Sequence, residues 1–292
     1  MMVKIYLVDG TFELFRAYYS SPKKNVGGRE VGASIGFARN IANLILYEKA
    51  THIAIAFDHV IESFRNDLYD GYKTGEGLEE EIKSQFPIVE QISSLMGIVT
   101  WPMIDFEADD ALATACRMYK DFAPILICSP DKDLCQCVDE GVHLFDRIRS
   151  KIINTAGVKE KFGIKPQSIP DYLALIGDTA DGIPGIPRWG AKSAASILEA
   201  FESIENIPLD VDLWPKIRGK KTLLENFIEF QDELKLYKKL ATLRTDVPLQ
   251  EDFKDLKWCS FSEDLEAFST DVLGNGETYK KLGNHLKAKR SG

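Results

Sequence analysis

The chain lacks the features that mark membrane, secreted or zinc-binding proteins. No run of about 18 apolar residues occurs in its 292 residues, so no membrane-spanning helix is expected. The opening stretch MMVKIYLVDG reaches an acid too early for a secretory signal and fits a buried strand better. Five cysteines, with Cys135 and Cys137 in a single C-x-C, indicate neither a disulfide framework nor a zinc site. We therefore expect free thiols and a cytoplasmic protein without membrane contact.

The chain also lacks an excess of basic residues. It carries 36 Lys and Arg against 45 Asp and Glu, a net charge of −9. Proteins that bind nucleic acid usually have the opposite balance, so the total charge argues against a polyanionic partner. That argument weakens if a group of acids binds metal ions, because the rest of the surface would then be close to neutral.

Short apolar runs alternate with helical patterns along the first half of the chain. Strands are expected at 3–9, 52–58, 97–102, 123–129 and 141–146, and helices at 34–50, 79–96 and 108–120. This alternation predicts an α/β fold with a mostly parallel central sheet. From about residue 165, Pro and Gly punctuation followed by an Ala-rich amphipathic pattern predicts a small helical domain.

Acids follow four successive strands of the expected sheet. The acids in question are Asp9, Asp58, Glu107, Asp109, Asp110, Asp131 and Asp133. A single acid in a loop is usually only solvated. The same placement at four strands is different, because the carboxyl ends of parallel strands meet at one edge, where active sites gather. The sequence therefore predicts a site there.

A dense group of carboxylates without His or Cys selects hard cations such as Mg²⁺ or Mn²⁺. Without cations the acids would raise one another's pKa values. Glu107 and Asp110 would share one face of a helix, and Asp131 and Asp133 would point the same way from an extended loop. Two ions about 4 Å apart would support in-line phosphoryl displacement. The acids therefore predict hydrolysis of a phosphodiester or phosphate ester.

Two further stretches follow this group. GDTADGIPG adds Asp178 and Asp181, which by themselves are ordinary turn acids. GIPRWGAKSA, at 185–194, nearly spells a P-loop, but Ala191 interrupts it and a turn precedes it instead of a strand. A tight hairpin between two helices, with backbone N–H groups and a helix N-terminus facing a phosphate backbone, explains this stretch better.

Six motifs occur in a fixed order along the chain: LVDG, FRNDLYDGYK, FEADDALA, SPDKDL, GDTADGIPGI and LATLRTDVPL. In these motifs the chain resembles the 5′→3′ exonuclease and flap endonuclease family, in particular the N-terminal nuclease domain of bacterial DNA polymerase I. The resemblance implies a PIN-like or resolvase-like core and a C-terminal helix-hairpin-helix (H3TH) domain. It implies a nuclease domain at 1–175 with a helical arch at about 61–95, a DNA-binding domain at 176–282 and a frayed tail at 283–292. No polymerase motifs follow, so we expect a stand-alone, monomeric nuclease.

The resemblance also implies roles for individual residues. Nine acids match the family's metal ligands: Asp9, Asp58, Glu107, Asp109, Asp110, Asp131, Asp133, Asp178 and Asp181. Three basic residues match positions near the scissile phosphate: Lys73, Arg65 and Arg16. Six residues match the hairpin that grips duplex DNA: Gly185, Arg188, Trp189, Gly190, Lys192 and Ser193. The implied cofactors are two Mg²⁺ or Mn²⁺ ions, with K⁺ at the hairpin as in relatives.

Simpler roles exist for several of these residues. Lys73 and Arg65 are also typical surface cations, and Arg16 could pair with an acid of the site. The chain departs from the family pattern in two places: Glu76, followed by the acidic run Glu79–Glu81, stands where a basic residue is usual, and Arg188 stands where Gly is usual. An acidic run of this kind also suits a helix N-terminus.

The expected function is hydrolysis of DNA at a 5′ flap, a nick or a 5′-ended duplex by a two-metal-ion mechanism. One alternative is a PIN-like RNase, against which the hairpin suited to duplex DNA argues. Another is a DNA-binding module without catalysis, which the complete set of matched acids disfavours. A nucleotide-binding enzyme built on GIPRWGAKS is the most distant alternative.

Overall fold

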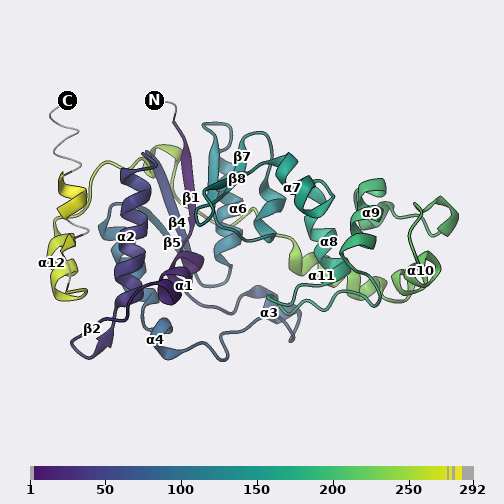
Figure 1. Cartoon of the computed structure of the whole chain (residues 1–292), viewed down its shortest axis with the longest axis horizontal. Coiled ribbons are helices and arrows are strands. Elements are labelled where there is room, and N and C mark those ends of the chain that lie inside the picture. Colours follow the sequence, from purple (N-terminus) through teal and green to yellow (C-terminus); the bar gives the residue numbers. More distant parts are fainter. Residues whose placement is uncertain (1–2, 275, 278–279, 285–292) are drawn as a thin grey trace. The chain divides into compact units, whose positions relative to one another are not determined.

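The computed structural model describes residues 3–274, 276–277 and 280–284 (Figure 1). The chain divides into two compact units. Unit 1 comprises the described residues within 1–61, 75–128 and 246–292, and unit 2 comprises 62–74 and 129–245. The domain boundaries expected from the family resemblance stay a prediction. Most of the expected tail, 285–292, lies outside the described residues.

Unit 1 contains four parallel strands that pair in the order β5, β4, β1, β6. Their bounds are Val99–Met103 for β5, His52–Asp58 for β4, Ile5–Asp9 for β1 and Ile125–Cys128 for β6. All residues of β1 and β6 are buried, as expected for apolar strands covered on both faces. The sequence prediction of a mostly parallel sheet is confirmed.

Unit 1 also contains helices. They are α1 Gly10–Ser20, α2 Gly32–Leu46, α4 Glu80–Lys83, α5 Phe86–Leu95, α6 Ala108–Tyr119 and α12 Asp264–Asp271. A short hairpin joins β2 Asn25–Val26 and β3 Arg29–Glu30, and a 3₁₀ turn spans Phe253–Leu256. Helices α1 and α6 pack against β4, while α2 packs on α1 and α5.

Two features of these helices differ from the sequence prediction. Helix α1, which follows β1 directly, was not among the expected helices. The helix expected over 79–96 is interrupted after Lys83, and α5 resumes at Phe86 with Pro87 in its first turn. Proline lacks the N–H that a continuous helix would need, but it fits the first turn of a new one.

Unit 2 consists mainly of helices and contains one small hairpin. Its helices are α3 Phe64–Leu68, α7 Thr155–Phe162, α8 Ile169–Ile176, α9 Ala191–Phe201, α10 Lys220–Glu229 and α11 Gln231–Ala241. Short 3₁₀ segments lie at Asp133–Cys137 (η1), Pro166–Ser168, Ile204–Asn206 and Val211–Leu213. Strands β7 Val142–Asp146 and β8 Lys151–Ile153 pair antiparallel.

No helix among the described residues is long and apolar enough to cross a membrane. The five cysteines are free thiols, as the sequence predicts, and Cys116, Cys128 and Cys135 are buried.

Candidate metal centre

The first group of acids lies at the carboxyl ends of the strands of unit 1. Asp9 is the last residue of β1 and caps α1, since its Oδ1 accepts a hydrogen bond from Phe12 N at 2.8 Å. Asp58 ends the neighbouring strand β4, and its Oδ1 accepts from Ala108 N, the first residue of α6, at 2.7 Å. Asp58 N in turn donates to Thr11 Oγ1 at 2.8 Å. These bonds gather the starts of α1 and α6 at one edge of the sheet.

The acids of FEADDALA are arranged by the start of α6. Glu107 caps the helix and Asp110 closes a capping box, in which Glu107 N donates to Asp110 Oδ2 at 3.1 Å. Glu107 and Asp110 are buried, Asp109 is half-buried, and Asp105 is exposed. A helix N-terminus stabilises such carboxylates. The structure thus brings Asp58, Glu107 and Asp110 to one helix start, next to the strand that carries Asp9, and leaves Asp105 in solvent.

The second group of acids lies in unit 2 and is the tightest. Ligand oxygens of Asp133, Asp178 and Asp181 lie within 4.8 Å of one another. Asp178 and Ile183 exchange backbone hydrogen bonds of 2.7 and 2.8 Å, which fold the GDTADGIPG stretch back on itself. Gly182 allows a close approach there, because a Cβ at this residue would lie 2.1 Å from the carbonyl oxygen of Gly71.

Asp131 is placed differently from the other acids of unit 2. Its side chain is exposed, and its Oδ1 accepts a hydrogen bond from Asp133 N at 2.9 Å. The expectation of an extended loop is wrong, because Asp133 already begins the 3₁₀ segment η1. Of the two, Asp133 joins the group with Asp178 and Asp181.

The electrostatics of this trio fit a cation site. Burial raises the pKa of Asp133 well above its usual range, and the neighbouring acids raise it further. Burial opposes ionisation of Asp181 too, but the charge of Lys73 and hydrogen bonds with Asp133 and Lys73 outweigh it and lower that pKa. Asp133 Oδ1 is buried without a hydrogen-bond partner in the structure. A buried carboxylate oxygen without a donor is suited to bind a hard cation.

The three predicted basic residues have different surroundings. Lys73 reaches the trio: its Nζ lies 3.1 Å from Asp181 Oδ1, and its backbone N donates to Asp181 O at 3.0 Å. Arg16 pairs with the buried Glu13 one turn earlier in α1, at 3.1 Å. Arg16 therefore pairs with an acid outside the predicted ligand set, and the expected pairing with an acid of the site is not seen among the described residues.

Arg65 differs most from its prediction. Its side chain is fully buried, and its guanidinium donates to Leu240 O at 2.8 Å and Thr242 O at 3.2 Å. The guanidinium therefore joins α3 to the end of α11. A buried group with such partners supports the fold of unit 2 and does not offer its charge to a substrate in this structure.

Lys132 was not singled out by the sequence. Its Nζ lies 2.6 Å from Asp178 Oδ2, and the pKa of Lys132 is raised, since its hydrogen bond with Asp178 and the nearby acids outweigh the opposing effect of burial. Its position between Asp131 and Asp133 in SPDKDL is the sequence feature that could have indicated a lysine beside these acids.

The acidic run that departs from the family pattern has partners within unit 1. Tyr18 Oη donates to Glu79 at 2.8 Å and to Glu81 at 3.3 Å, and Lys23 forms an ion pair with Glu81. Glu80 and Glu81 also lie in the first turn of α4, the position at which acids suit the helix dipole. The run therefore connects the start of α4 to α1 by hydrogen bonds, which gives it a structural role.

The hairpin at 185–194 exposes half of its predicted contact residues. Arg188, Gly190 and Lys192 are exposed, and Gly190 precedes α9, whose Ser193 Oγ hydrogen-bonds with Gly190. Gly185 has φ of +70°, and a Cβ there would lie 2.3 Å from Gly177 N. Glycine is therefore needed at this turn.

Trp189 is buried, unlike the exposed residues predicted for the hairpin contact. Its ring is buried, lies 5.9 Å from Trp214 and 6.1 Å from Phe227 between centroids, and donates its Nε1–H to Leu223 O at 3.1 Å. Trp189 therefore packs in the core of unit 2 and presents no surface to a ligand in this structure.

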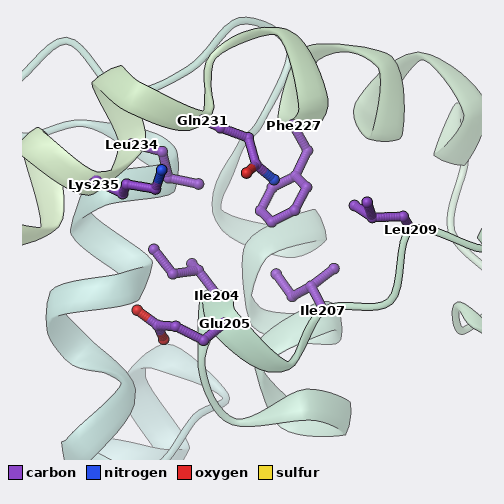
Figure 2. A pocket seen from close by; sticks show the side chains of 8 residues that line it. All are labelled: Ile204, Glu205, Ile207, Leu209, Phe227, Gln231, Leu234 and Lys235. Atoms are coloured by element: carbon purple, nitrogen blue, oxygen red, sulfur yellow. The ribbon is translucent and has the colours of Figure 1, made fainter.

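Unit 2 also contains an apolar cavity of about 510 Å³, and Figure 2 shows the side chains that line it. They are Ile204, Glu205, Ile207, Leu209, Phe227, Gln231, Leu234 and Lys235. Glu205 is already paired with Lys238 at 2.8 Å. None of the predicted site residues lines this cavity, so it is not part of the candidate metal centre.

Family models match the chain in two adjoining segments. Residues 4–163 match the 5′-3′ exonuclease N-terminal resolvase-like domain, and residues 164–264 match the 5′-3′ exonuclease C-terminal SAM fold. The resolvase-like model alone covers more than half of the chain.

Curated relatives agree with these models. The chain is 35% identical over 260 residues to a 5′-3′ exonuclease of Buchnera aphidicola, which covers 87% of this chain and 86% of the relative. It is 33% identical over 260 residues to a 5′-3′ exonuclease of Aquifex aeolicus, with 88% and 87% covered. It is also 34% identical over 263 residues to DNA polymerase I of Rhizobium leguminosarum, of which it spans only 26%.

Solved structures share the fold. The zinc-bound 5′-exonuclease of T5 superposes with a TM-score of 0.68 at 21% identity, covering 94% of this chain and all of that one. The catalytic core of Rad2 in complex with DNA gives a TM-score of 0.63 at 16% identity, with 98% and 93% covered. With the two adjoining domain models and the full-length relatives, these findings show that the chain belongs to the 5′-3′ exonuclease family and is an enzyme of the nuclease class.

Proposed function

We propose that the chain is a metal-dependent, structure-specific 5′ nuclease that hydrolyses DNA phosphodiester bonds at 5′ flaps, nicks or 5′-ended duplexes. The observation that carries this proposal is the trio Asp133, Asp178 and Asp181, of which the first two are buried and in which Asp133 Oδ1 has no hydrogen-bond partner. The acids at the strand edge of unit 1 add a second group of oxygen ligands. Both groups consist of carboxylates alone, the donor set of Mg²⁺ and Mn²⁺.

The acids of each group would hold divalent ions. Those of unit 1 are Asp9, Asp58, Glu107, Asp109 and Asp110, and those of unit 2 are Asp131, Asp133, Asp178 and Asp181. Asp131 is exposed, so it suits a contact through water better than direct coordination. Bound divalent ions supply an activated water and stabilise the leaving oxygen in a two-metal-ion hydrolysis. No side chain is required as nucleophile.

The protein's own contribution is to orient the carboxylates and to bring a cation to the phosphate. Each strand-edge acid of unit 1 that caps a helix has one oxygen fixed by a backbone N–H, and an ionised carboxylate keeps further lone pairs for a metal. Lys73 is half-exposed beside Asp181, so its ammonium can exchange this partner for a phosphate oxygen.

The proposal includes the finer properties expected from the family resemblance. Mg²⁺ or Mn²⁺ would serve as two bound ions, K⁺ would bind at the hairpin, and the protein would act as a cytoplasmic monomer. The exposed Arg188 and Lys192, with the N-terminus of α9, would contact the phosphate backbone of duplex DNA.

The proposed activity is tested by incubating the protein with labelled DNA, with and without Mg²⁺. The substrates are a 5′ flap, a nicked duplex and single-stranded DNA. We expect cleavage near the junction of the flap, and complete loss of cleavage in EDTA that added Mg²⁺ restores. Product ends are mapped by denaturing electrophoresis. Equal cleavage in EDTA, or preferred cleavage of a matched RNA hairpin, would contradict the proposal.

Arg188 offers a test of the hairpin contact. Its φ of +69° lies in the left-handed region, which costs a non-glycine residue roughly 1 kcal/mol. Arg188→Gly should therefore fold at least as stably as the wild type but bind duplex DNA more weakly. We expect the slope of log affinity against log salt to become shallower by about one unit, as for one lost phosphate contact.

Arg188→Lys is the matched control for this test, because it keeps both the charge and the backbone strain. It should bind with the salt dependence of the wild type, as measured by fluorescence anisotropy on nicked DNA. If Arg188→Gly binds with an unchanged salt slope, Arg188 does not contact the DNA backbone.

A further inference from the structure

Lys132 lies within the acid trio of unit 2. Its Nζ is 2.6 Å from Asp178 Oδ2, and the Lys132 side chain is 34% exposed while that of Asp178 is 2% exposed. The backbone carbonyl of Lys132 accepts a hydrogen bond from Cys135 N at 3.0 Å, at the start of the 3₁₀ segment that also carries Asp133. The loop that supplies a ligand acid therefore also supplies a cation.

Both oxygens of Asp178 have partners. Oδ1 accepts a hydrogen bond from Ala180 N at 3.1 Å, and Oδ2 contacts the ammonium of Lys132. The orientation of the Asp178 carboxylate is thus set before any ion arrives. Like Asp178 Oδ2, Asp133 Oδ1 has no conventional hydrogen-bond donor, but no lysine or arginine of the described residues forms an ion pair with Asp133.

The ammonium of Lys132 has two effects on such a site. In the metal-free protein it offsets part of the repulsion among carboxylates that lie within 4.8 Å of one another. Towards a divalent ion it acts in the opposite direction, because it repels the ion and contacts an oxygen that the ion would use. A lysine in this place therefore stabilises the empty site and weakens the filled one.

We propose that Lys132 is an internal counter-ion: it holds Asp178 in the metal-free protein and lowers the affinity of the trio for divalent ions. This inference rests on the proposed metal-dependent function. Lys132 is a positioning residue in this role, since it acts through Asp178. The consequence is a protein that folds without metal and binds its ions loosely enough to exchange them.

Lys132→Met tests the inference in the full chain without DNA. We expect the dissociation constant for Mn²⁺, measured by calorimetry or electron paramagnetic resonance, to fall roughly tenfold, because a unit charge beside the ion is removed. In EDTA we expect the midpoint of thermal unfolding to fall by about 2–4 °C. A purely structural lysine would not tighten metal binding on removal.

Three further variants complete the experiment. Lys132→Arg keeps the charge and should bind Mn²⁺ close to the wild-type affinity. Lys132→Gln keeps an N–H donor for Asp178 without the charge, so it should show the tighter binding even if Lys132→Met folds poorly. Lys159→Met, which removes a 62% exposed lysine paired with Glu199, should change neither property.

Mn²⁺ binding by Lys132→Gln that is equal to or weaker than that of the wild type would overturn the inference. That outcome leaves the proposed function intact, since the wild type still binds the ion. A wild type that binds no Mn²⁺ would instead contradict the proposed function itself.

Discussion

Asp133→Asn is expected to reduce DNA cleavage by roughly a thousandfold and to make the metal-free protein more stable. The side chain is buried, its Oδ1 has no partner, and it belongs to the tightest carboxylate group among the described residues. Asparagine keeps the volume and can donate a hydrogen bond to Asp181, but it offers no charge to a cation. Activity and stability should therefore change in opposite directions.

The pKa of Asp133 gives the sign of the change in stability that is expected for Asp133→Asn. The pKa of Asp133 in the folded protein is raised above its unfolded value of about 3.9, so the folded state binds this proton more tightly. The contribution of Asp133 to stability therefore declines as pH rises from about 4 through the raised pKa. Asp133→Asn removes that decline, so its advantage over the wild type in EDTA should grow toward neutral pH.

Thermal unfolding in EDTA at several pH values and cleavage of a labelled 5′ flap measure the two effects. Asp232→Asn is the control, because its side chain is 95% exposed and pairs with Lys235 at the surface. It should alter neither property. A variant Asp133→Asn that cleaves at the wild-type rate in Mg²⁺ would remove Asp133 from the ligand set.

Arg65→Met is expected to lower the free energy of unfolding by about 3 kcal/mol. The fully buried guanidinium donates to the carbonyl oxygens of Leu240 and Thr242, and methionine would leave both without this donor. The guanidinium also lies over the ring of Phe64, 4.7 Å from its centroid. Because these contacts join α3 to α11, the loss should appear as instability of unit 2.

Urea unfolding, followed by tryptophan fluorescence, measures this change, since Trp189 and Trp214 both lie in unit 2. Arg149→Met is the matched control: that arginine is 74% exposed and pairs with Asp146, whose Oδ1 also accepts two backbone hydrogen bonds. We expect the control to change stability by less than about 1 kcal/mol. Unchanged stability of Arg65→Met together with lost cleavage would restore Arg65 as a residue of the active site.

The sequence by itself determined the parallel sheet and the strand ends at which Asp9 and Asp58 lie. Buried strands leave continuous apolar runs, and acids directly after them share an edge of a parallel sheet. The start of α6 was equally local, since Glu107 and Asp110 form a capping box three residues apart. Such features depend on neighbours in the chain, and the family motifs record the same local patterns.

The tertiary structure alone decided which charged groups meet. Asp133 joins Asp178 and Asp181 while Asp131 stays exposed, and Lys132 completes an ion pair that spacing does not reveal. Arg65 looks like a surface cation in the sequence, yet its partner Leu240 lies 175 residues away and fixes it in the interior. Whether a charge faces a substrate or the core depends on burial and on distant partners, and these arise only when separate segments pack together.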